Sequence, residues 1–156
     1  MDHERREALR RGGAISLAAL VAAAGWLPRD ALADGWNKGA FETHSLDETL
    51  KALGGTAPVP SKDVVFFSTP DIAENGAVVP IGITSKVPQT DSIAILIEKN
   101  PNMLAAVFDI PPGTDPSLST RIKMGQTSSV YALVKANGRY YVTSKEIKVT
   151  LGGCGG

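Results

Sequence analysis

The sequence predicts a mainly β domain, and three observations support this class. Residues from Asp63 onward divide into seven short apolar or alternating segments at regular spacing. Gly, Pro, Asn and Asp cluster between these segments, where turns are needed. One segment ahead of the strands has the spacing of an amphipathic helix. This pattern favours an immunoglobulin-like antiparallel β-sandwich of about seven strands with one N-terminal helix and a flexible C-terminal arm.

The helix is expected over residues 45–54, in the stretch SLDETLKALG. Ser45 stands at the N-cap position and Glu48 follows three residues later, which is the spacing of a capping box. Gly54 supplies the left-handed residue that commonly ends a helix. The apolar stripe along this helix consists of Leu46, Leu50 and Leu53. We expect this stripe to pack the helix over one end of a sheet.

The strands are expected at residues 64–68, 77–87, 92–99, 104–110, 119–124, 129–135 and 139–151. The last two are joined by Asn137-Gly138, a dipeptide that strongly favours a two-residue hairpin turn. One face of the second strand carries Val79, Ile81 and Ile83. Pro80 interrupts this strand and has no N–H to donate, so it predicts an edge position or a bulge.

Two of the predicted strands are apolar on both faces. Opposite the core face, the segment SVYALVK carries Tyr131 and Leu133, and the segment SIAILIE carries Ala94 and Leu96. A sheet face in contact with water is normally polar. Either the helix and loops of this chain cover the second face, or a partner subunit does. Of these two interpretations we favour the partner subunit.

Composition excludes several classes of function. The 156 residues suit one domain, and 16 Lys and Arg residues balance 16 Asp and Glu residues. No basic face for nucleic acid is indicated. Met103 and Met124 are expected in the core. His44 stands alone before the helix, so the chain lacks a set of metal ligands. Neither a nucleophile with an adjacent base nor a phosphate-binding loop is present. We therefore predict no catalytic residue, no metal and no cofactor.

Residues 1–33 are predicted to be an export signal. Arginines precede the apolar run GGAISLAALVAAAGWL, and residues 31–33 form an A-x-A cleavage site. Arg10-Arg11 favour the twin-arginine route, although Gly12-Gly13 stand where a bulky apolar residue is usual. The apolar run is short for a membrane span. We expect a periplasmic domain over residues 34–151, with no membrane contact once the signal is removed.

The lone cysteine lies in the last five residues, predicted to be a flexible arm. Cys154 stands between Gly152-Gly153 and Gly155-Gly156. In an oxidising compartment an unpaired cysteine indicates an intermolecular partner or a reactive thiol. The strand before it alternates and can hold the arm until about Leu151. Three further residues reach roughly 10 Å, and glycines keep the arm thin enough to enter a narrow channel.

Local charge does not activate this thiol. A reactive cysteine is usually close to Lys, Arg, His⁺ or a helix N-terminus, which stabilise the thiolate. Cys154 has none of these nearby in sequence, and the C-terminal carboxylate is two residues away. We therefore expect activation to come from the active site of a partner enzyme.

Several stretches resemble the SoxY family, the sulfur-carrying subunits of the periplasmic thiosulfate-oxidation (Sox) system. They are the tail GGCGG, the preceding SKEIKVTLGG, and the blocks IAENGAVVPI and STRIKMGQTSSV. The resemblance extends over essentially the whole chain after the signal. It implies a carrier rather than an enzyme, with sulfur held covalently on Cys154 as an S-thiosulfonate or a persulfide.

The same resemblance implies partners. SoxZ, another small immunoglobulin-like protein, would form a heterodimer with the chain and be exported with it. The haem enzyme SoxAX would couple thiosulfate to Cys154, and the metal-dependent hydrolase SoxB would release sulfate. Where it is present, the sulfane dehydrogenase SoxCD would oxidise the remaining persulfide sulfur.

Two other interpretations remain open. A C-terminal Gly-Gly is also found in ubiquitin-like sulfur carriers, but these are cytosolic β-grasp proteins, which the export signal and seven strands disfavour. The main alternative is an exported structural module whose Cys154 forms a permanent intermolecular disulfide.

Overall fold

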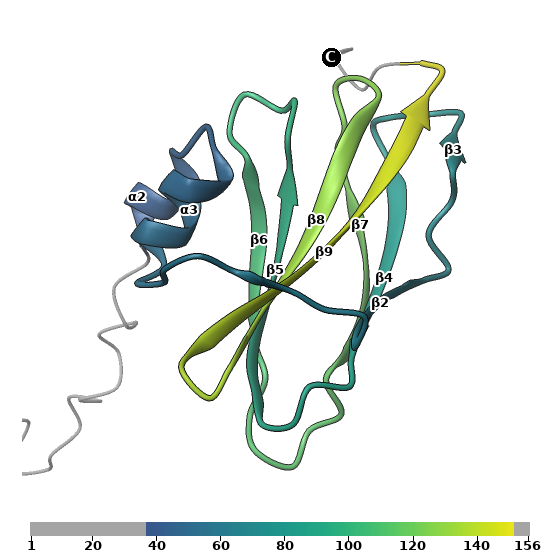
Figure 1. Ribbon diagram of the computed structural model, residues 1–156. Helices are drawn as coiled ribbons and strands as arrows, with labels where there is room; N and C mark the ends of the chain where they lie inside the picture. Colours follow the sequence, from purple (N-terminus) through teal and green to yellow (C-terminus); the bar gives the residue numbers. More distant parts are fainter. Residues whose placement is uncertain (1–36, 152–156) are drawn as a thin grey trace, which may run out of the picture. The chain divides into compact units, whose positions relative to one another are not determined.

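The computed structural model describes residues 37–151 (Figure 1). The predicted export signal, residues 1–33, lies outside the described residues. So does the predicted arm, residues 152–156, with Cys154 and its four flanking glycines.

Two short helices precede nine strands in the described chain. The helices are α2 (Lys38–Phe41) and α3 (Leu46–Ala52). The strands are β1 (Val59–Pro60), β2 (Val64–Phe67), β3 (Ile72–Ala73), β4 (Val79–Ser85), β5 (Thr90–Ile97), β6 (Leu104–Asp109), β7 (Ser117–Ile122), β8 (Ser128–Ala136) and β9 (Arg139–Val149). The seven longer strands coincide with the seven predicted ones to within a few residues at each end. The two-residue strands β1 and β3 and the helix α2 were not predicted.

The strands form two sheets. One has the order β1-β9-β8-β5-β6, with β3 also paired to β9, and the other has the order β2-β4-β7. All pairings among the seven longer strands are antiparallel, whereas β1 and β3 lie parallel to β9. The predicted mainly β, immunoglobulin-like sandwich is thus confirmed. Three strands, β1, β3 and β8, pair with β9 (Figure 1).

The main core lies between the two sheets, where alternate residues of facing strands meet. The larger of its fully buried side chains are Val79, Ile81, Ile83, Ile93, Ile95, Ile97, Met124, Val130, Val134 and Ile147. The predicted apolar face of β4 and the core position of Met124 are therefore confirmed. Met103 is buried as well, in a second cluster on the outer face of the larger sheet.

Helix α3 begins and ends as its sequence predicts. The Ser45 hydroxyl accepts a hydrogen bond from the Glu48 N–H at 3.2 Å. The Glu48 carboxylate in turn accepts one from the His44 N–H at 3.0 Å, which lowers the pKa of that carboxyl group. Gly54 follows the helix with φ of 79°, in the left-handed region. The cap thus satisfies N–H groups that the first helical turn leaves unpaired.

The second face of the larger sheet is covered by this chain's own helices. Ala94, Leu96 and Leu133 are buried with Ala40 of α2 and Leu50 of α3 in one cluster. Our preference for a partner subunit over these three residues is therefore wrong, and Tyr131, the fourth residue of that face, is partly buried against the same cluster. The sequence pattern showed that the face is apolar, but the same pattern results whether a helix or another chain covers it.

Two turn and edge predictions have different outcomes. The Asn137-Gly138 hairpin is confirmed, since these residues have φ of 51° and 71°, as a type I′ turn requires. Pro80, expected at an edge or bulge, lies instead in β4, the central strand of the smaller sheet. It is tolerated there because β2 pairs with β4 only from Gly82 onward, so Pro80 faces a neighbour on one side only.

Candidate functional site

The last residues of β9 form the base from which the predicted arm extends. We call residues 149–151 the arm root. The buried Ile147 and the exposed Lys148 alternate as the sequence predicts for a half-buried strand. β9 ends at Val149, but hydrogen bonding of the backbone continues to Leu151, the last described residue.

One side of the arm root is bonded to residues 71–76. The Thr150 N–H donates to the Ala73 carbonyl at 3.1 Å, and the Thr150 hydroxyl donates to the Glu74 carbonyl at 3.1 Å. The Gly76 N–H donates to the Leu151 carbonyl at 2.8 Å. These bonds continue the β3–β9 ladder past the end of the strand, so the backbone is held up to the last described residue.

The other side is bonded to the loop between β7 and β8. The Val149 N–H donates to the Thr127 hydroxyl at 2.9 Å. In the same loop, the Met124 N–H donates to the Gly76 carbonyl at 2.7 Å, which joins this loop to the segment on the opposite side. The Asn100 side chain fixes the loop further.

Asn100 connects the β5–β6 loop to the β7–β8 loop. Its amide nitrogen donates to the Lys123 carbonyl at 2.8 Å, and its carbonyl oxygen accepts from the Gly125 N–H at 3.2 Å. Three loops and the arm root thus form one continuous set of hydrogen bonds. The sequence did not predict these bonds, because most of them join backbone groups that any residue has.

A lysine holds the segment that leads into β3. The Lys145 ammonium donates to the Thr69 carbonyl at 2.6 Å and pairs with the Asp71 carboxylate at 3.0 Å. Asp71 is largely exposed, so the ion pair itself contributes little. The hydrogen bond to the carbonyl keeps residues 69–71 against β9.

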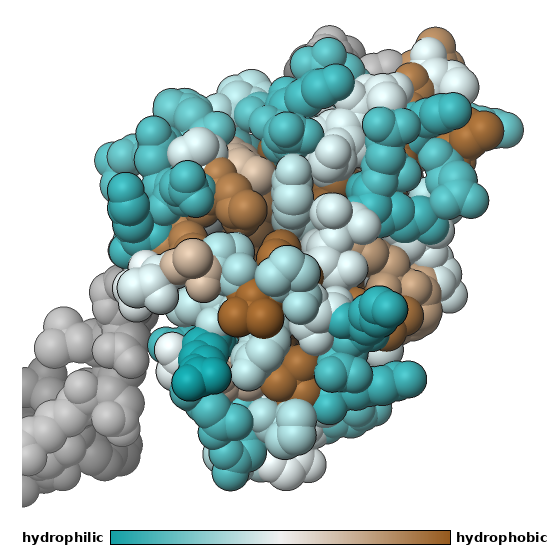
Figure 2. Space-filling model, in the orientation of Figure 1, coloured by the Kyte–Doolittle hydropathy of each residue, from teal (hydrophilic) through white to brown (hydrophobic). Residues whose placement is uncertain are grey.

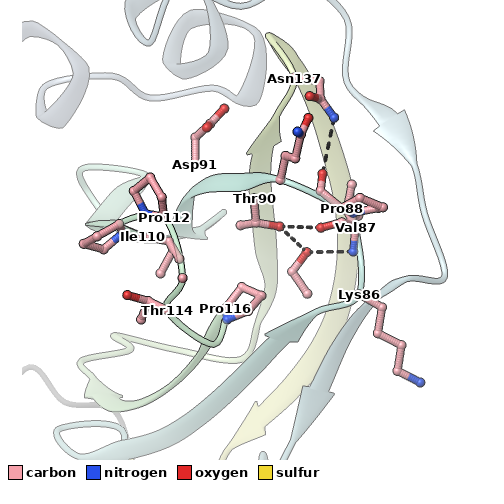
Figure 3. Close-up of a pocket in the computed structure, with 14 residues that line it drawn as sticks. Lys86, Val87, Pro88, Thr90, Asp91, Ile110, Pro112, Thr114, Pro116 and Asn137 are labelled. Carbon is pink, nitrogen blue, oxygen red and sulfur yellow. Dashed lines mark hydrogen bonds between the residues drawn. The ribbon is translucent and has the colours of Figure 1, made fainter.

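A cavity of about 740 Å³ lies at the other end of β9, next to the β8–β9 hairpin. Its lining includes Pro88, Pro111, Pro112 and Pro116. In Figure 3 the Lys86 side chain points away from these prolines, and Thr90 and Asn137 take part in hydrogen bonds that brace the loop. The hydroxyls of Ser85 and Thr90, which also line the cavity, are hydrogen-bonded to each other at 2.8 Å.

The described residues contain no cluster of three His, Cys, Asp or Glu side chains able to hold a metal ion. Within residues 37–151, no helix has the length and hydrophobicity needed to span a bilayer. His44, the histidine considered above, has its Nδ1 2.7 Å from the Pro101 carbonyl. It therefore braces the approach to α3 against the β5–β6 loop.

Comparison with known proteins decides the family. The family model described as sulfur oxidation protein SoxY matches residues 50–154. The chain belongs to the SoxY family. A solved structure of the sulfur carrier protein SoxY from Chlorobium limicola f thiosulfatophilum is 34% identical, with a TM-score of 0.61. The match covers 68% of this chain and 96% of that chain.

A second solved structure is described as the structural basis of T cell specificity and activation by the bacterial superantigen toxic shock syndrome toxin-1. It matches at 14% identity with a TM-score of 0.38. That match covers 55% of this chain and 98% of the other, and it is too weak to support an argument. No curated protein sequence matches the chain. The SoxY family is one of carrier proteins, so the chain has a carrier role in sulfur oxidation among the proteins of a Sox system.

Proposed function

We propose that this protein carries sulfur covalently on Cys154 and presents it to partner enzymes on the arm formed by Gly152, Gly153, Gly155 and Gly156. The observation that supports this most directly is that the SoxY family match extends as far as Cys154. The hydrogen bonds that hold the arm root agree with it, because they fix the backbone up to Leu151, three residues before Cys154.

Loading forms a sulfur–sulfur bond and releases two electrons. The Cys154 thiolate joins the outer sulfur of thiosulfate: Cys–S⁻ + S₂O₃²⁻ → Cys–S–S–SO₃⁻ + 2e⁻. The electrons pass to the haem of SoxAX, so the carrier needs no cofactor of its own. Because no cationic side chain neighbours Cys154 in sequence, the partner's active site supplies the charge that stabilises the thiolate.

Release proceeds by hydrolysis in a second enzyme. SoxB adds water to the terminal sulfur and leaves a persulfide: Cys–S–S–SO₃⁻ + H₂O → Cys–S–S⁻ + SO₄²⁻ + 2H⁺. Where SoxCD is present, it removes six electrons from the outer sulfur: Cys–S–S⁻ + 3H₂O → Cys–S–SO₃⁻ + 6H⁺ + 6e⁻. A second hydrolysis by SoxB then restores the Cys154 thiolate.

The cell compartment and the stable partner follow from the same proposal. Residues 1–33 direct the chain to the periplasm, by the twin-arginine route if Arg10-Arg11 are read as the signal pair. Residues 34–151 fold as the carrier domain and form a heterodimer with SoxZ. SoxAX, SoxB and SoxCD bind transiently, one after another.

Intact mass of the mature protein from thiosulfate-grown cells tests the proposal. We expect added sulfur or thiosulfonate that a reductant removes and that maps to Cys154. An unmodified thiol, or a dimer joined only through Cys154, would instead favour the structural module with a permanent disulfide.

Two variants separate the thiol from its arm. Cys154→Ser should abolish thiosulfate-dependent activity with no change in the free energy of unfolding. Replacing Gly152-Gly153 by two bulky residues should leave the thiol titratable but slow turnover by the partner enzymes, because the wider arm cannot enter a channel. Full activity of the second variant would contradict entry through a narrow channel.

A further inference from the structure

One lysine lies on the face of β9 that is turned toward the main core. Lys145 is paired with Val130, which is fully buried between the two sheets. Residues directly opposite each other in an antiparallel ladder share one face of the sheet. Lys145 therefore lies on the same side as the fully buried Ile147, two residues further along the strand. The Lys145 side chain is only 26% exposed.

This face is an unfavourable place for a lysine. Taking an ammonium group out of water costs free energy unless a partner replaces the water. The neighbouring charged residues of β9, Glu146 and Lys148, are exposed. Figure 2 shows hydrophilic side chains among hydrophobic ones at the end of the molecule where β3 and the last residues of β9 lie. Since an apolar side chain at residue 145 would avoid the cost of burying a charge, stability alone does not explain the lysine.

The ammonium group of Lys145 is bonded to the chain that leaves the smaller sheet. It donates to the Thr69 carbonyl at 2.6 Å and pairs with the Asp71 carboxylate at 3.0 Å. Thr69 follows β2, and its hydroxyl accepts from the Gly82 N–H of β4 at 3.0 Å. Because the Asp71 side chain is 89% exposed, the carbonyl is the stronger partner. Lys145 thus connects β9 to a fixed point on the smaller sheet.

The chain from this fixed point leads to the arm root. We call residues 69–76, which include β3, the strap; β3 lies beside the end of β9 (Figure 1). Three backbone bonds join the strap to residues 148–151: the Lys148 N–H to the Asp71 carbonyl, the Thr150 N–H to the Ala73 carbonyl, and the Gly76 N–H to the Leu151 carbonyl. Lys145 holds the strap against β9 just before these bonds begin.

We propose that Lys145 is a positioning residue for the carrier arm, which holds the strap and so fixes the direction in which the arm leaves the domain. This rests on the proposed carrier function. Cys154 follows Leu151 by only three residues, so any displacement of the arm root displaces the thiol as well. An arm that leaves in a fixed direction loses less conformational freedom when it enters the channel of an enzyme.

The first test compares amide hydrogen exchange in the mature carrier and in its Lys145→Met variant. Methionine fits an apolar face but cannot donate a hydrogen bond. The Lys148, Thr150 and Gly76 amides take part in the bonds between strap and arm root, and they should exchange about tenfold faster. The Val149 amide is bonded on the other side of the arm root, so its exchange should change by no more than about twofold.

The stability of the variant separates a positioning role from a structural one. Lys145→Met loses one hydrogen bond but also removes the cost of burying the charge, so the Tm should change by less than about 5 °C. If Lys145→Met does not fold, Lys145→Gln provides the same comparison, because its amide is too short to reach the Thr69 carbonyl.

The second test is the steady-state rate at which the purified haem enzyme of the same Sox system loads Cys154 with thiosulfate, as carrier concentration is varied. Lys145→Met should raise the KM for the carrier about fivefold with kcat unchanged, because the loosened arm has to be ordered on binding and is then correctly placed. Alkylation of Cys154 by iodoacetamide should proceed at the wild-type rate, since the thiol itself is unaltered.

Two further variants serve as rescue and control. Lys145→Arg keeps a charged donor, so its KM should stay within about twofold of the wild type. Lys86→Met removes an exposed lysine whose side chain points away from the nearby cavity (Figure 3), and its KM should equal that of the wild type.

Four results would overturn the positioning role. They are unchanged exchange at Lys148, Thr150 and Gly76; equally faster exchange in the β8–β9 ladder, which would make Lys145 an ordinary stabilising residue; faster exchange with an unchanged KM; and an effect of Asp71→Asn as large as that of Lys145→Met, which would transfer the role to the exposed ion pair. Failure of the wild type to be loaded on Cys154 would overturn the carrier function itself, and that result is distinct because it needs no variant.

Discussion

The two ends of β9 are held by different forces. At its first end, Tyr140 is buried beneath the helices, and its hydroxyl donates to the Leu53 carbonyl at 2.7 Å. The same burial raises the pKa of the Tyr140 phenol. At its last end, Val149 and Thr150 are fixed by hydrogen bonds, while Leu151 remains exposed. Apolar burial therefore stabilises the domain at one end, and polar bonds set the position of the arm root at the other.

The largest expected difference between the two ends comes from matched Leu→Ala substitutions. Leu133 is 1% exposed under the helices, and its β9 partner is Val142. Leu133→Ala should lower the free energy of unfolding by about 2–5 kcal/mol, through lost burial and the cavity left behind. Leu151→Ala, at the exposed end, should change it by less than about 0.5 kcal/mol. Urea denaturation of both variants measures the contrast, and equal losses would contradict it.

A second substitution tests how closely the helical layer packs on β9. A Cβ added at Gly55 would lie 2.6 Å from the Tyr140 ring and 2.8 Å from Leu50 Cδ1. Gly55→Ala should therefore cost about 1–3 kcal/mol by overpacking.

Gly39→Ala is the matched control for this substitution. The Cβ added there meets only the Asn37 side chain, at 3.8 Å, so the change should not destabilise the protein. Thermal unfolding of the two variants gives the comparison. A Gly55→Ala protein as stable as the wild type would show that the helices move away from the sheet without cost.

The elements that were predicted from sequence are those with a strong local signal. The cap at Ser45, the positive φ at Asn137-Gly138 and the alternation of the longer strands all depend on residues close together in the chain. β1, β3 and α2 lack such a signal, because two to four residues show no periodicity. Their positions depend on pairing with β9 or packing on the sheet, which are long-range contacts.

In the candidate site, too, one part was predicted from the sequence and another part was not. Cys154 was singled out because it is the one cysteine and glycines surround it. The bonds that fix the arm root could not be foreseen from the sequence, because most of them join backbone groups such as the N–H of Gly76 and the carbonyl of Ala73. Every residue has a backbone carbonyl, and every residue except proline has a backbone N–H. Thr127, Asn100 and Thr150 contribute side chains there, and polar residues in loops are too common to be informative.

Thr127→Val tests the polar end with a smaller expected effect. The substitution keeps the side-chain shape but removes the acceptor for the Val149 N–H. The free energy of unfolding should fall by about 1 kcal/mol, and amide exchange at residues 149–151 should accelerate more than exchange in the core. Thr127→Ser, which retains the hydroxyl, is the control. Unchanged exchange at Val149 would show that the β3 side holds the arm root alone.

The smallest effect is expected at the cap of α3, on the helix that covers the first end of β9. The Glu48 pKa lies below its ordinary value of 4.5, chiefly because the carboxylate accepts a hydrogen bond from the His44 N–H. A carboxyl group whose pKa is lowered by folding stabilises the protein above its unfolded pKa, and this contribution is lost as pH falls through the folded pKa. Wild type should therefore unfold at a higher Tm than Glu48→Gln at pH 7, and the difference should shrink as the pH is lowered below 4.5. Because Glu48 is fully exposed, added salt should also reduce the difference. If the difference in Tm does not shrink as the pH is lowered, the effect of Glu48→Gln comes from the shape of the amide and not from the lost charge.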